Sequence, residues 1–155
     1  MRSGAATQNS AEAPTVLFLC TGNYYRSRFA EELFNHLAAR RGHPARSTSR
    51  GFNPNPKLNP GTISEHALRG LHALGIAPAS ASRPPAAVRQ EDFLRHPHCI
   101  ALSKKEHQPI MEKLFPEFAG RIQYWQVEDL LWSSPEAALA GIERSVRDLL
   151  DTLTA

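Results

Sequence analysis

Apolar positions along this chain fall into two alternating patterns, short unbroken runs and longer segments with helical spacing. Residues 16–19 read Val-Leu-Phe-Leu, and a run that is apolar at every position is typical of a central strand in a parallel sheet. From Ser27 onward the apolar residues recur three and four positions apart, which predicts an amphipathic helix. This helix is expected to end in the basic turn before Gly42.

The same alternation continues through the rest of the chain. Further strands are expected at residues 45–50, 98–102 and 121–127, and further helices at 62–74, 89–94, 103–115 and 134–153. Regular alternation of strand and helix predicts an α/β fold, with a parallel sheet and helices on both of its faces. In such sheets ligands bind beyond the carboxyl ends of the strands.

Two of these helices begin with the signature of a capping box, a hydroxyl residue three positions before a glutamate. Thr62 with Glu65 predicts one start, and Ser103 with Glu106 predicts the other. Pro109 lies inside the second helix, so either a late start or a kink is expected there. Residues 51–61 are rich in proline and asparagine and are expected to form a loop near the one that follows the first strand.

Cys20 stands at the carboxyl end of the first predicted strand, and Arg26 arrives where the following helix begins. Backbone N–H groups in so tight a loop, together with a helix N-terminus, form a binding site for phosphate. The planar guanidinium of Arg26 can hold two phosphate oxygens, and Gly22 permits a backbone conformation that other residues resist. These positive surroundings favour the thiolate form of Cys20, a nucleophile aimed at phosphorus.

Residues 20–28 read Cys-Thr-Gly-Asn-Tyr-Tyr-Arg-Ser-Arg. This stretch resembles the phosphate-binding loop of the low-molecular-weight protein tyrosine phosphatases, whose usual form is Cys-x-Gly-Asn-x-Cys-Arg-Ser-Pro. The matching positions are Cys20, Gly22, Asn23, Arg26 and Ser27. Tyr25 stands in place of the family's second cysteine, and Arg28 stands in place of its proline.

The resemblance covers nearly the whole chain, with weaker echoes at residues 49–51 and 127–129. It implies a single-domain, three-layer α/β sandwich with a four-stranded parallel sheet in the order 2-1-3-4 and helices on both faces. The residues expected to bind phosphate are Thr21, Gly22, Asn23, Tyr24, Tyr25 and Arg26. No metal or other cofactor is expected, because Arg26 and the loop amides balance the phosphate charge.

Two further loop residues have an expected role beside the thiolate. Ser27 can donate its hydroxyl to the sulfur, or it can cap the first helix, and both roles are compatible. Asn23 is expected to fix the loop by hydrogen bonding within it.

Hydrolysis of an ester by a thiolate also needs an acid that protonates the departing oxygen. Asp129 follows the fourth predicted strand and falls on the aspartate of the family's Asp-Pro pair, whereas Leu130 replaces the proline. Glu128 is the alternative acid, because it is adjacent and protonates at a similar pH. The residues expected to line the substrate site are Tyr24, Leu131 and Trp132.

Length and composition indicate the number of domains, the kinds of partner and the location to expect for this protein. A chain of 155 residues suits one domain, expected over residues 14–155 after a small, polar and disordered leader at 1–13. A net charge of +3 with scattered basic pairs predicts no nucleic acid and no membrane as partner, and no apolar run reaches membrane-spanning length. Two cysteines without a disulfide spacing, and no export signal, predict a cytoplasmic protein.

Together these features predict a cysteine-dependent phosphatase that hydrolyses phosphotyrosine proteins or small aryl phosphate monoesters through a phosphocysteine. Inorganic phosphate is the expected product and competitor. One alternative is a redox enzyme similar to arsenate reductases of this fold, but Cys99 is the only other cysteine and starts a strand. The other is a phosphate-binding regulatory module with attenuated catalysis, since Arg28 and Leu130 replace family prolines.

Overall fold

Four parallel strands form the sheet of this protein, seen in a computed structural model that describes residues 15–127 and 134–153. The strands are β1 (Val16–Cys20), β2 (Ser47–Gly51), β3 (His98–Ala101) and β4 (Gln123–Tyr124). Their order is β2-β1-β3-β4, with β1 parallel to both of its neighbours. The predicted α/β fold and strand order are therefore confirmed. The leader expected at residues 1–13 lies outside the described residues.

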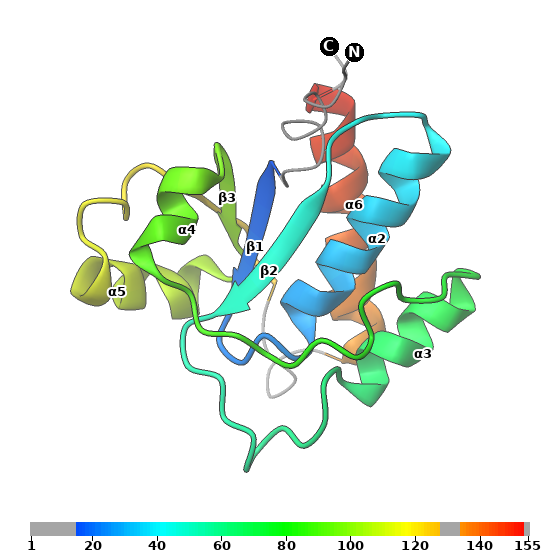
Figure 1. Ribbon diagram of the computed structural model, residues 1–155, viewed down its shortest axis with the longest axis horizontal. Coiled ribbons are helices and arrows are strands. Elements are labelled where there is room, and N and C mark those ends of the chain that lie inside the picture. The colour runs from blue at the N-terminus through cyan, green and yellow to red at the C-terminus, as the bar shows by residue number, and fades with distance from the viewer. Residues whose placement is uncertain (1–14, 128–133, 154–155) are drawn as a thin grey trace, which may run out of the picture.

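The helices of the described residues are α2 (Arg26–Arg40), α3 (Glu65–Ala73), α4 (Gln90–Arg95), α5 (Lys104–Leu114) and α6 (Pro135–Leu153). Figure 1 shows α2, α3 and α6 on one side of the sheet and α4 and α5 on the other.

Side chains of β1 point alternately to the two faces of the sheet, as the pleat of a strand requires. Phe18 and Cys20 belong to the core that β1 forms with α2, α3 and α6. Leu17 and Leu19 belong to the second core, which includes residues of α4 and α5. Helices cover both faces, which explains why β1 is apolar at every position.

The carboxyl ends of β1 and β2 meet at one edge of the sheet, drawn at the bottom of Figure 1. There the carbonyl oxygen of Cys20 accepts the backbone N–H of Phe52 at 3.0 Å, and that of Thr21 accepts the N–H of Asn53 at 2.8 Å. The loop after β1 therefore lies beside the loop after β2, as the sequence predicts.

Several predicted boundaries differ from the structure. β4 has only two residues, although a strand was expected over 121–127. Beyond it the backbone still donates to the end of β3, from Trp125 to Ala101 and from Val127 to Leu102, each at 2.8 Å. The segment thus stays beside the sheet without continuing the regular strand pairing.

Two helix starts also differ. Tyr25 is the residue before α2, so Ser27 lies inside the first turn and is not its N-cap. Ser64, not Thr62, caps α3, because the Ser64 hydroxyl accepts the backbone N–H of His66 at 3.0 Å. The Thr62 hydroxyl instead donates to the carbonyl oxygen of Ala81. The capping box predicted at Thr62 is therefore wrong.

Only one of the two hydrogen bonds of the capping box predicted at the start of α5 is present. The Ser103 hydroxyl accepts the backbone N–H of Glu106 at 3.3 Å, but the N–H of Ser103 donates to Nδ1 of His107 and not to the Glu106 carboxylate. The helix does not start late, because it runs unbroken from the residue after Ser103 through Pro109.

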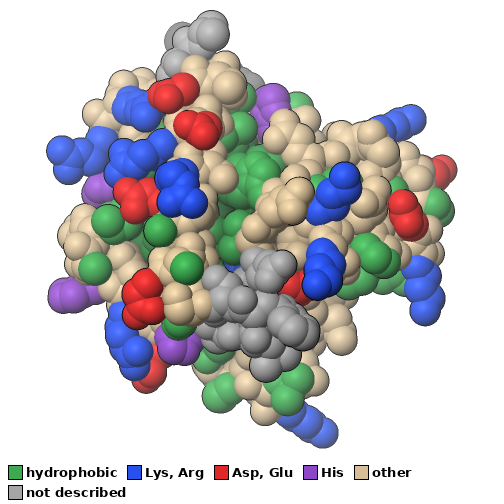
Figure 2. Space-filling model, turned by 180° about the vertical axis from the view of Figure 1, so that it is seen from behind, with side chains coloured by type: hydrophobic (Ala, Val, Ile, Leu, Met, Phe, Trp, Pro, Cys, Tyr) green, Lys and Arg blue, Asp and Glu red, His purple; other side chains and the backbone are tan. Residues whose placement is uncertain are grey.

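Charged side chains on the face shown in Figure 2 are mixed in sign, with Lys and Arg interspersed among Asp and Glu. Among residues 15–127 and 134–153, no helix combines the length and apolar character needed to cross a membrane.

Candidate active site

Cys20 ends β1 with its side chain buried, and the first turn of α2 faces it. Its Sγ atom lies 3.0 Å from Oγ of Ser27, a hydrogen-bond distance. Ser27 Oγ also accepts a bond of 3.0 Å from the Nδ2 amide of Asn23. Because an amide nitrogen only donates, the hydroxyl hydrogen of Ser27 can turn to the sulfur once the thiol has lost its proton.

Asn23 holds the β1–α2 loop (residues 20–26) in shape. Its φ of 51° lies in the left-handed region, which asparagine tolerates better than most residues. Its amide donates to Ser27 and, at 2.8 Å, to Ser49 of β2, and its Oδ1 accepts the N–H of Ala86 at 3.0 Å. The loop hydrogen bond expected from the sequence is present, together with two that reach other segments.

The backbone conformation at position 22 does not require glycine, contrary to the sequence-based expectation. Its φ is not among the positive values of the described glycines. A Cβ atom here would lie 2.7 Å from Nδ2 of Asn59 in the neighbouring loop. At Gly51 a Cβ atom would lie 2.8 Å from the carbonyl oxygen of Thr21. Gly51 therefore allows the two loops to approach closely, whereas at Gly22 the nearest atom is the movable end of the Asn59 side chain.

Arg26 is only 4% exposed, and α5 holds its guanidinium group. Nη1 and Nη2 donate to the two carboxylate oxygens of Glu106 at 2.9 and 3.0 Å. Nη1 also donates to the carbonyl oxygen of Val127 at 2.9 Å. The sequence analysis placed Glu106 only in a capping box and missed this ion pair. Its position in the first turn after the strand next to β1 is the signal that could have found it.

His107 contacts the other end of the same loop. Its Nδ1 accepts the backbone N–H of Ser103 at 3.0 Å, so the neutral ring carries its hydrogen on Nε2. Nε2 lies 3.1 Å from Oγ1 of Thr21 and donates to it. The first turn of α5 thus contacts the loop near both of its ends, at Thr21 and at Arg26.

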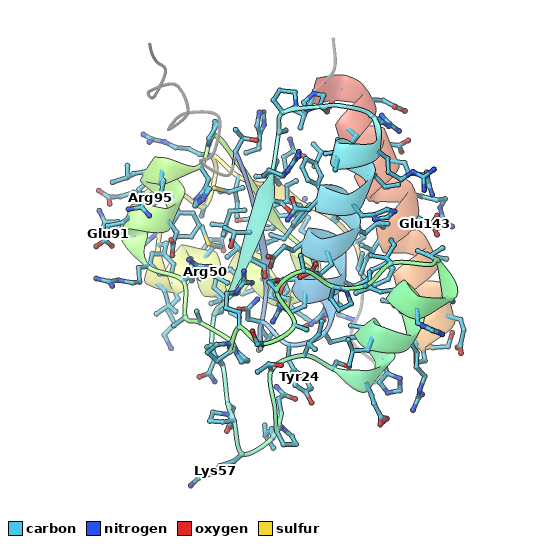
Figure 3. The ribbon with its side chains drawn as sticks, turned by 45° about the vertical axis from the view of Figure 1, so that its right-hand side comes forward. Tyr24, Arg50, Lys57, Glu91, Arg95 and Glu143 are labelled. Atoms are coloured by element: carbon cyan, nitrogen blue, oxygen red, sulfur yellow. The ribbon has the colours of Figure 1, made fainter. Side chains whose placement is uncertain are left out.

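A pocket of about 340 Å³ lies over the β1–α2 loop, between it and the residues that follow β2. Its lining residues are Cys20, Thr21, Gly22, Tyr24, Tyr25, Arg26, Asn53, Asn55, Leu58, Asn59, Ser64 and His66. The Tyr24 hydroxyl donates to the carbonyl oxygen of Pro60 at 2.6 Å and joins the two walls. Figure 3 shows Tyr24 beside the segment that carries Lys57 at its tip.

Arg28, which replaces the family's proline, is fully buried behind the loop. Its guanidinium donates to the carbonyl oxygens of Thr62, Arg83 and Ser80 at 3.0, 3.1 and 2.7 Å. It also lies 3.8 Å from the carboxylates of Glu31 and Glu32. Burial lowers the pKa of the Arg28 guanidinium, while the two carboxylates oppose this effect.

Arg83, whose side chain is 31% exposed, completes a cluster of two arginines and two glutamates. It donates to both oxygens of Glu31 at 2.8 and 2.6 Å, and these hydrogen bonds raise its pKa. Ser49 donates to Glu31 at 2.6 Å and accepts from Asn23. The cluster is therefore connected to the β1–α2 loop through one serine, a link that no local motif in the sequence could reveal.

Some predicted site residues lie outside the described residues. These are Asp129, Leu131 and Trp132, with Glu128 and Leu130 beside them. The described chain before them ends at Val127, whose carbonyl oxygen accepts a hydrogen bond from Arg26.

Cys99 lies away from the pocket. It pairs with Leu17 in the sheet, three positions before Cys20, and its side chain belongs to the opposite core. Burial raises the pKa of its thiol to about 12, with a smaller contribution from Asp92. Over residues 15–127 and 134–153, no group of three or more His, Cys, Asp or Glu side chains is arranged to hold a metal ion.

A cysteine-to-arginine loop at the carboxyl edge of a small parallel sheet defines a class of α/β phosphatases. The sequence pattern of the family "Low molecular weight phosphotyrosine protein phosphatase" matches residues 15–155, and the chain belongs to this family.

Individual relatives are distant. A protein-arginine-phosphatase of Bacillus subtilis (strain 168) is 28% identical over 109 residues, which cover 69% of this chain and 67% of the relative. A low molecular weight protein tyrosine phosphatase from T. tengcongensis has a similar structure, with a TM-score of 0.71, 24% identity and coverage of 88% and 97% of the two chains. Vibrio vulnificus Wzb in complex with benzylphosphonate gives a TM-score of 0.73 at 14% identity, covering 90% and 99%.

Proposed function

We propose that this phosphatase hydrolyses phosphotyrosine or small aryl phosphate monoesters through a phosphocysteine at Cys20. The observation that carries the proposal is the placement of Cys20 Sγ 3.0 Å from the Ser27 hydroxyl, inside a loop that ends in the buried Arg26. The Ser27 hydroxyl can donate to the sulfur, and the guanidinium of Arg26 can bind the phosphoryl oxygens.

In the first step the Cys20 thiolate attacks phosphorus, and the bond between phosphorus and the leaving oxygen breaks. Asp129 gives its proton to that oxygen, with Glu128 as the alternative donor. In the second step a water molecule attacks the phosphocysteine, the S–P bond breaks, and Asp129 takes the water's proton. Ser27 donates to the departing thiolate, and inorganic phosphate leaves.

Charge on the phosphoryl oxygens is balanced by Arg26 and the backbone N–H groups of residues 21–26. Transfer of a phosphoryl group depends mainly on positioning and on electrostatic stabilisation of these oxygens. Arg26 supplies a planar two-pronged donor, while Asn23 and its three hydrogen bonds keep the amides in place.

The pocket walls favour an aromatic leaving group. Tyr24 is anchored by its bond to Pro60, so its ring can lie along a substrate ring, and Leu131 and Trp132 are proposed to line the other side. The benzylphosphonate complex of Wzb supports this pairing of an aromatic ring with a phosphoryl-like group.

Phosphoarginine is a second candidate substrate, favoured by the likeness to a protein-arginine-phosphatase. The same thiolate would then attack phosphorus and break a P–N bond, and the acid would protonate the departing guanidine nitrogen, so that the product leaves as a guanidinium. Peptides that carry phosphotyrosine or phosphoarginine in the same flanking sequence would separate the two substrates by their kcat/KM values.

The redox and regulatory alternatives are less well supported. A disulfide needs Cα atoms within about 7 Å, whereas Cys99 is three positions further back on the neighbouring strand and faces the other core. The attenuated alternative rests on Arg28, which three backbone carbonyl oxygens hold, and on Leu130, which lies outside the described residues.

Hydrolysis of para-nitrophenyl phosphate by the wild type, Cys20→Ser and Cys99→Ala tests the proposal. The wild type and Cys99→Ala are expected to turn over the substrate, and Cys20→Ser is expected to be inactive. Turnover by Cys20→Ser would exclude the phosphocysteine route.

A further inference from the structure

We propose that Glu106 is a positioning residue that fixes the orientation of the Arg26 guanidinium for phosphoryl transfer. The inference rests on the proposed function, in which Arg26 binds the transferred phosphoryl group. Glu106 lies eighty positions from Arg26 and outside the loop motif, so its assignment comes from the contacts alone.

These contacts fix both the plane and the direction of the guanidinium. Glu106 accepts one hydrogen from Nη1 and one from Nη2, and the carbonyl oxygen of Val127 accepts another from Nη1. A guanidinium has five N–H donors in one plane, arranged as two two-pronged edges. Glu106 holds the Nη1–Nη2 edge, which sets the direction of the Nε–Nη2 edge that suits two phosphate oxygens.

Glu106 lies behind Arg26 and not in the position of the phosphate. Arg26 lines the pocket over the β1–α2 loop, whereas Glu106 is not among the pocket's lining residues. The Arg26 side chain is 4% exposed and the Glu106 side chain 26%, so the ion pair is largely shielded from water. This arrangement is that of a support and not of a competitor for the phosphate.

Glu106 itself stands on a fixed element. It lies in the first turn of α5, which the Ser103 hydroxyl caps by accepting the Glu106 backbone N–H. The next residue, His107, is fully buried and bonds to Ser103 and Thr21. A carboxylate on such a turn can hold its partner within the narrow tolerance that catalysis requires.

The charge of Glu106 and its orientation of Arg26 are expected to affect ligand binding in opposite directions, so an experiment can distinguish the two roles. A carboxylate near a bound dianion repels it, so neutralising Glu106 strengthens ground-state phosphate binding if charge alone matters. Losing the orientation of Arg26 instead weakens the interactions that form in the transition state.

The test compares Glu106→Gln with Glu112→Gln, an exposed carboxylate further along the same helix. Turnover of para-nitrophenyl phosphate, inhibition by phosphate and inhibition by vanadate, which mimics the transition state, are measured. For Glu106→Gln we expect kcat to fall about tenfold or more while KM changes less than about threefold. In Glu106→Gln the affinity for vanadate should fall in proportion to kcat/KM, while the affinity for phosphate should not fall. Glu112→Gln should behave as the wild type.

A second comparison shows whether Glu106 acts through Arg26. In the Arg26→Lys background, Glu106→Gln should cost much less vanadate affinity than in the wild type, because no guanidinium remains to be oriented. Vanadate affinity is read from its protection of Cys20 against iodoacetamide, which needs no turnover. An equal cost in both backgrounds would indicate general destabilisation and would overturn the proposal.

Full turnover by Glu106→Gln, or faster turnover with tighter vanadate binding, would also overturn it. If Glu106→Gln fails to fold, Glu106→Asp can be used, because it keeps the carboxylate. This variant should show an intermediate loss of protection by vanadate. Protection equal to that of the wild type would count against the proposal. A wild type that does not hydrolyse the ester but loses vanadate protection on Glu106→Gln would contradict the proposed function and leave the role of Glu106 standing.

Discussion

Side-chain hydrogen bonds help to hold the β1–α2 loop in its shape. The buried amide of Asn23 makes three hydrogen bonds. One of them is to Ser27, whose Oγ also lies within hydrogen-bond distance of the Cys20 sulfur. Arg26 is fixed by Glu106 and Val127. At the scale of the residue, each of these contacts gives a substitution with a defined expected effect.

Arg26→Lys is expected to remove most of the turnover of para-nitrophenyl phosphate while the protein stays folded. Lysine keeps the positive charge but cannot bind two phosphoryl oxygens and the two Glu106 oxygens with one planar group. Steady-state kinetics together with the thermal unfolding midpoint checks this. Turnover close to that of the wild type would show that Arg26 has no part in phosphoryl transfer.

Asp129→Asn is expected to slow hydrolysis of aryl phosphates by about 10²–10⁴-fold, the usual contribution of a general acid. The loss should shrink for esters whose leaving groups are strong acids, since these depart without a proton. Rates for a series of substituted phenyl phosphates measure this. If Asp129→Asn is silent and Glu128→Gln is not, Glu128 is the acid.

Local residues of the site could be predicted from the sequence, whereas their distant partners could not. Cys20, Asn23, Arg26 and Ser27 stand within eight positions, and a strand–loop–helix pattern is enough to bring them together. Glu106 joins them only through the order of the strands.

At the scale of the element, α2 differs from the family at its third residue. Arg28 is placed where the first turn of α2 meets the carbonyl oxygens of Thr62 and Ser80, so it ties the helix to two loops. Glu32 ties the second loop again, because its carboxylate accepts the backbone N–H groups of Ala79 and Ser80 at 2.8 and 3.1 Å.

Arg28→Met is expected to lower the free energy of unfolding by about 3–5 kcal/mol, because it leaves buried carboxylate charge without one of its cations. The matched control is Arg69→Met, which removes an exposed pair with Glu65 and should change stability by less than about 0.5 kcal/mol. Urea unfolding of the two variants measures both values. A similar small loss in both would show that the cluster contributes no net stability.

Element types could be predicted from apolar periodicity, but their boundaries depended on hydrogen bonds between segments. Thr62 and Ser64 are both hydroxyl residues before α3, and only the bond from Thr62 to Ala81 explains why Ser64 is the cap. The end of β4 is likewise set by β3, which has four residues and limits how far a neighbour can pair.

At the scale of the whole molecule, the sheet separates the two cysteines. Cys20 faces the core of α2, α3 and α6, and Cys99 faces the other core, where burial raises its pKa to about 12. Cys99 therefore stays a neutral thiol at physiological pH, and Tyr25 offers no sulfur next to Cys20.

Inactivation by peroxide is accordingly expected to become resistant to dithiothreitol with time. A sulfenic acid at Cys20 has neither Cys99 nor a neighbouring cysteine to trap it as a disulfide, so it proceeds to higher oxidation states. Intact mass should show added oxygen atoms. A loss of two hydrogens that maps to a Cys20–Cys99 disulfide, with full recovery on reduction, would contradict this and revive the redox alternative.

The Arg28 cluster also constrains the path by which this protein could diverge from relatives that have proline at that position. Replacing Arg28 by proline alone would leave Glu32 without this cation and the carbonyl oxygens of Thr62 and Ser80 without this donor. The residues around position 28 are expected to be inherited as a group, so that exchanging this one residue between relatives is more disruptive than exchanging the group.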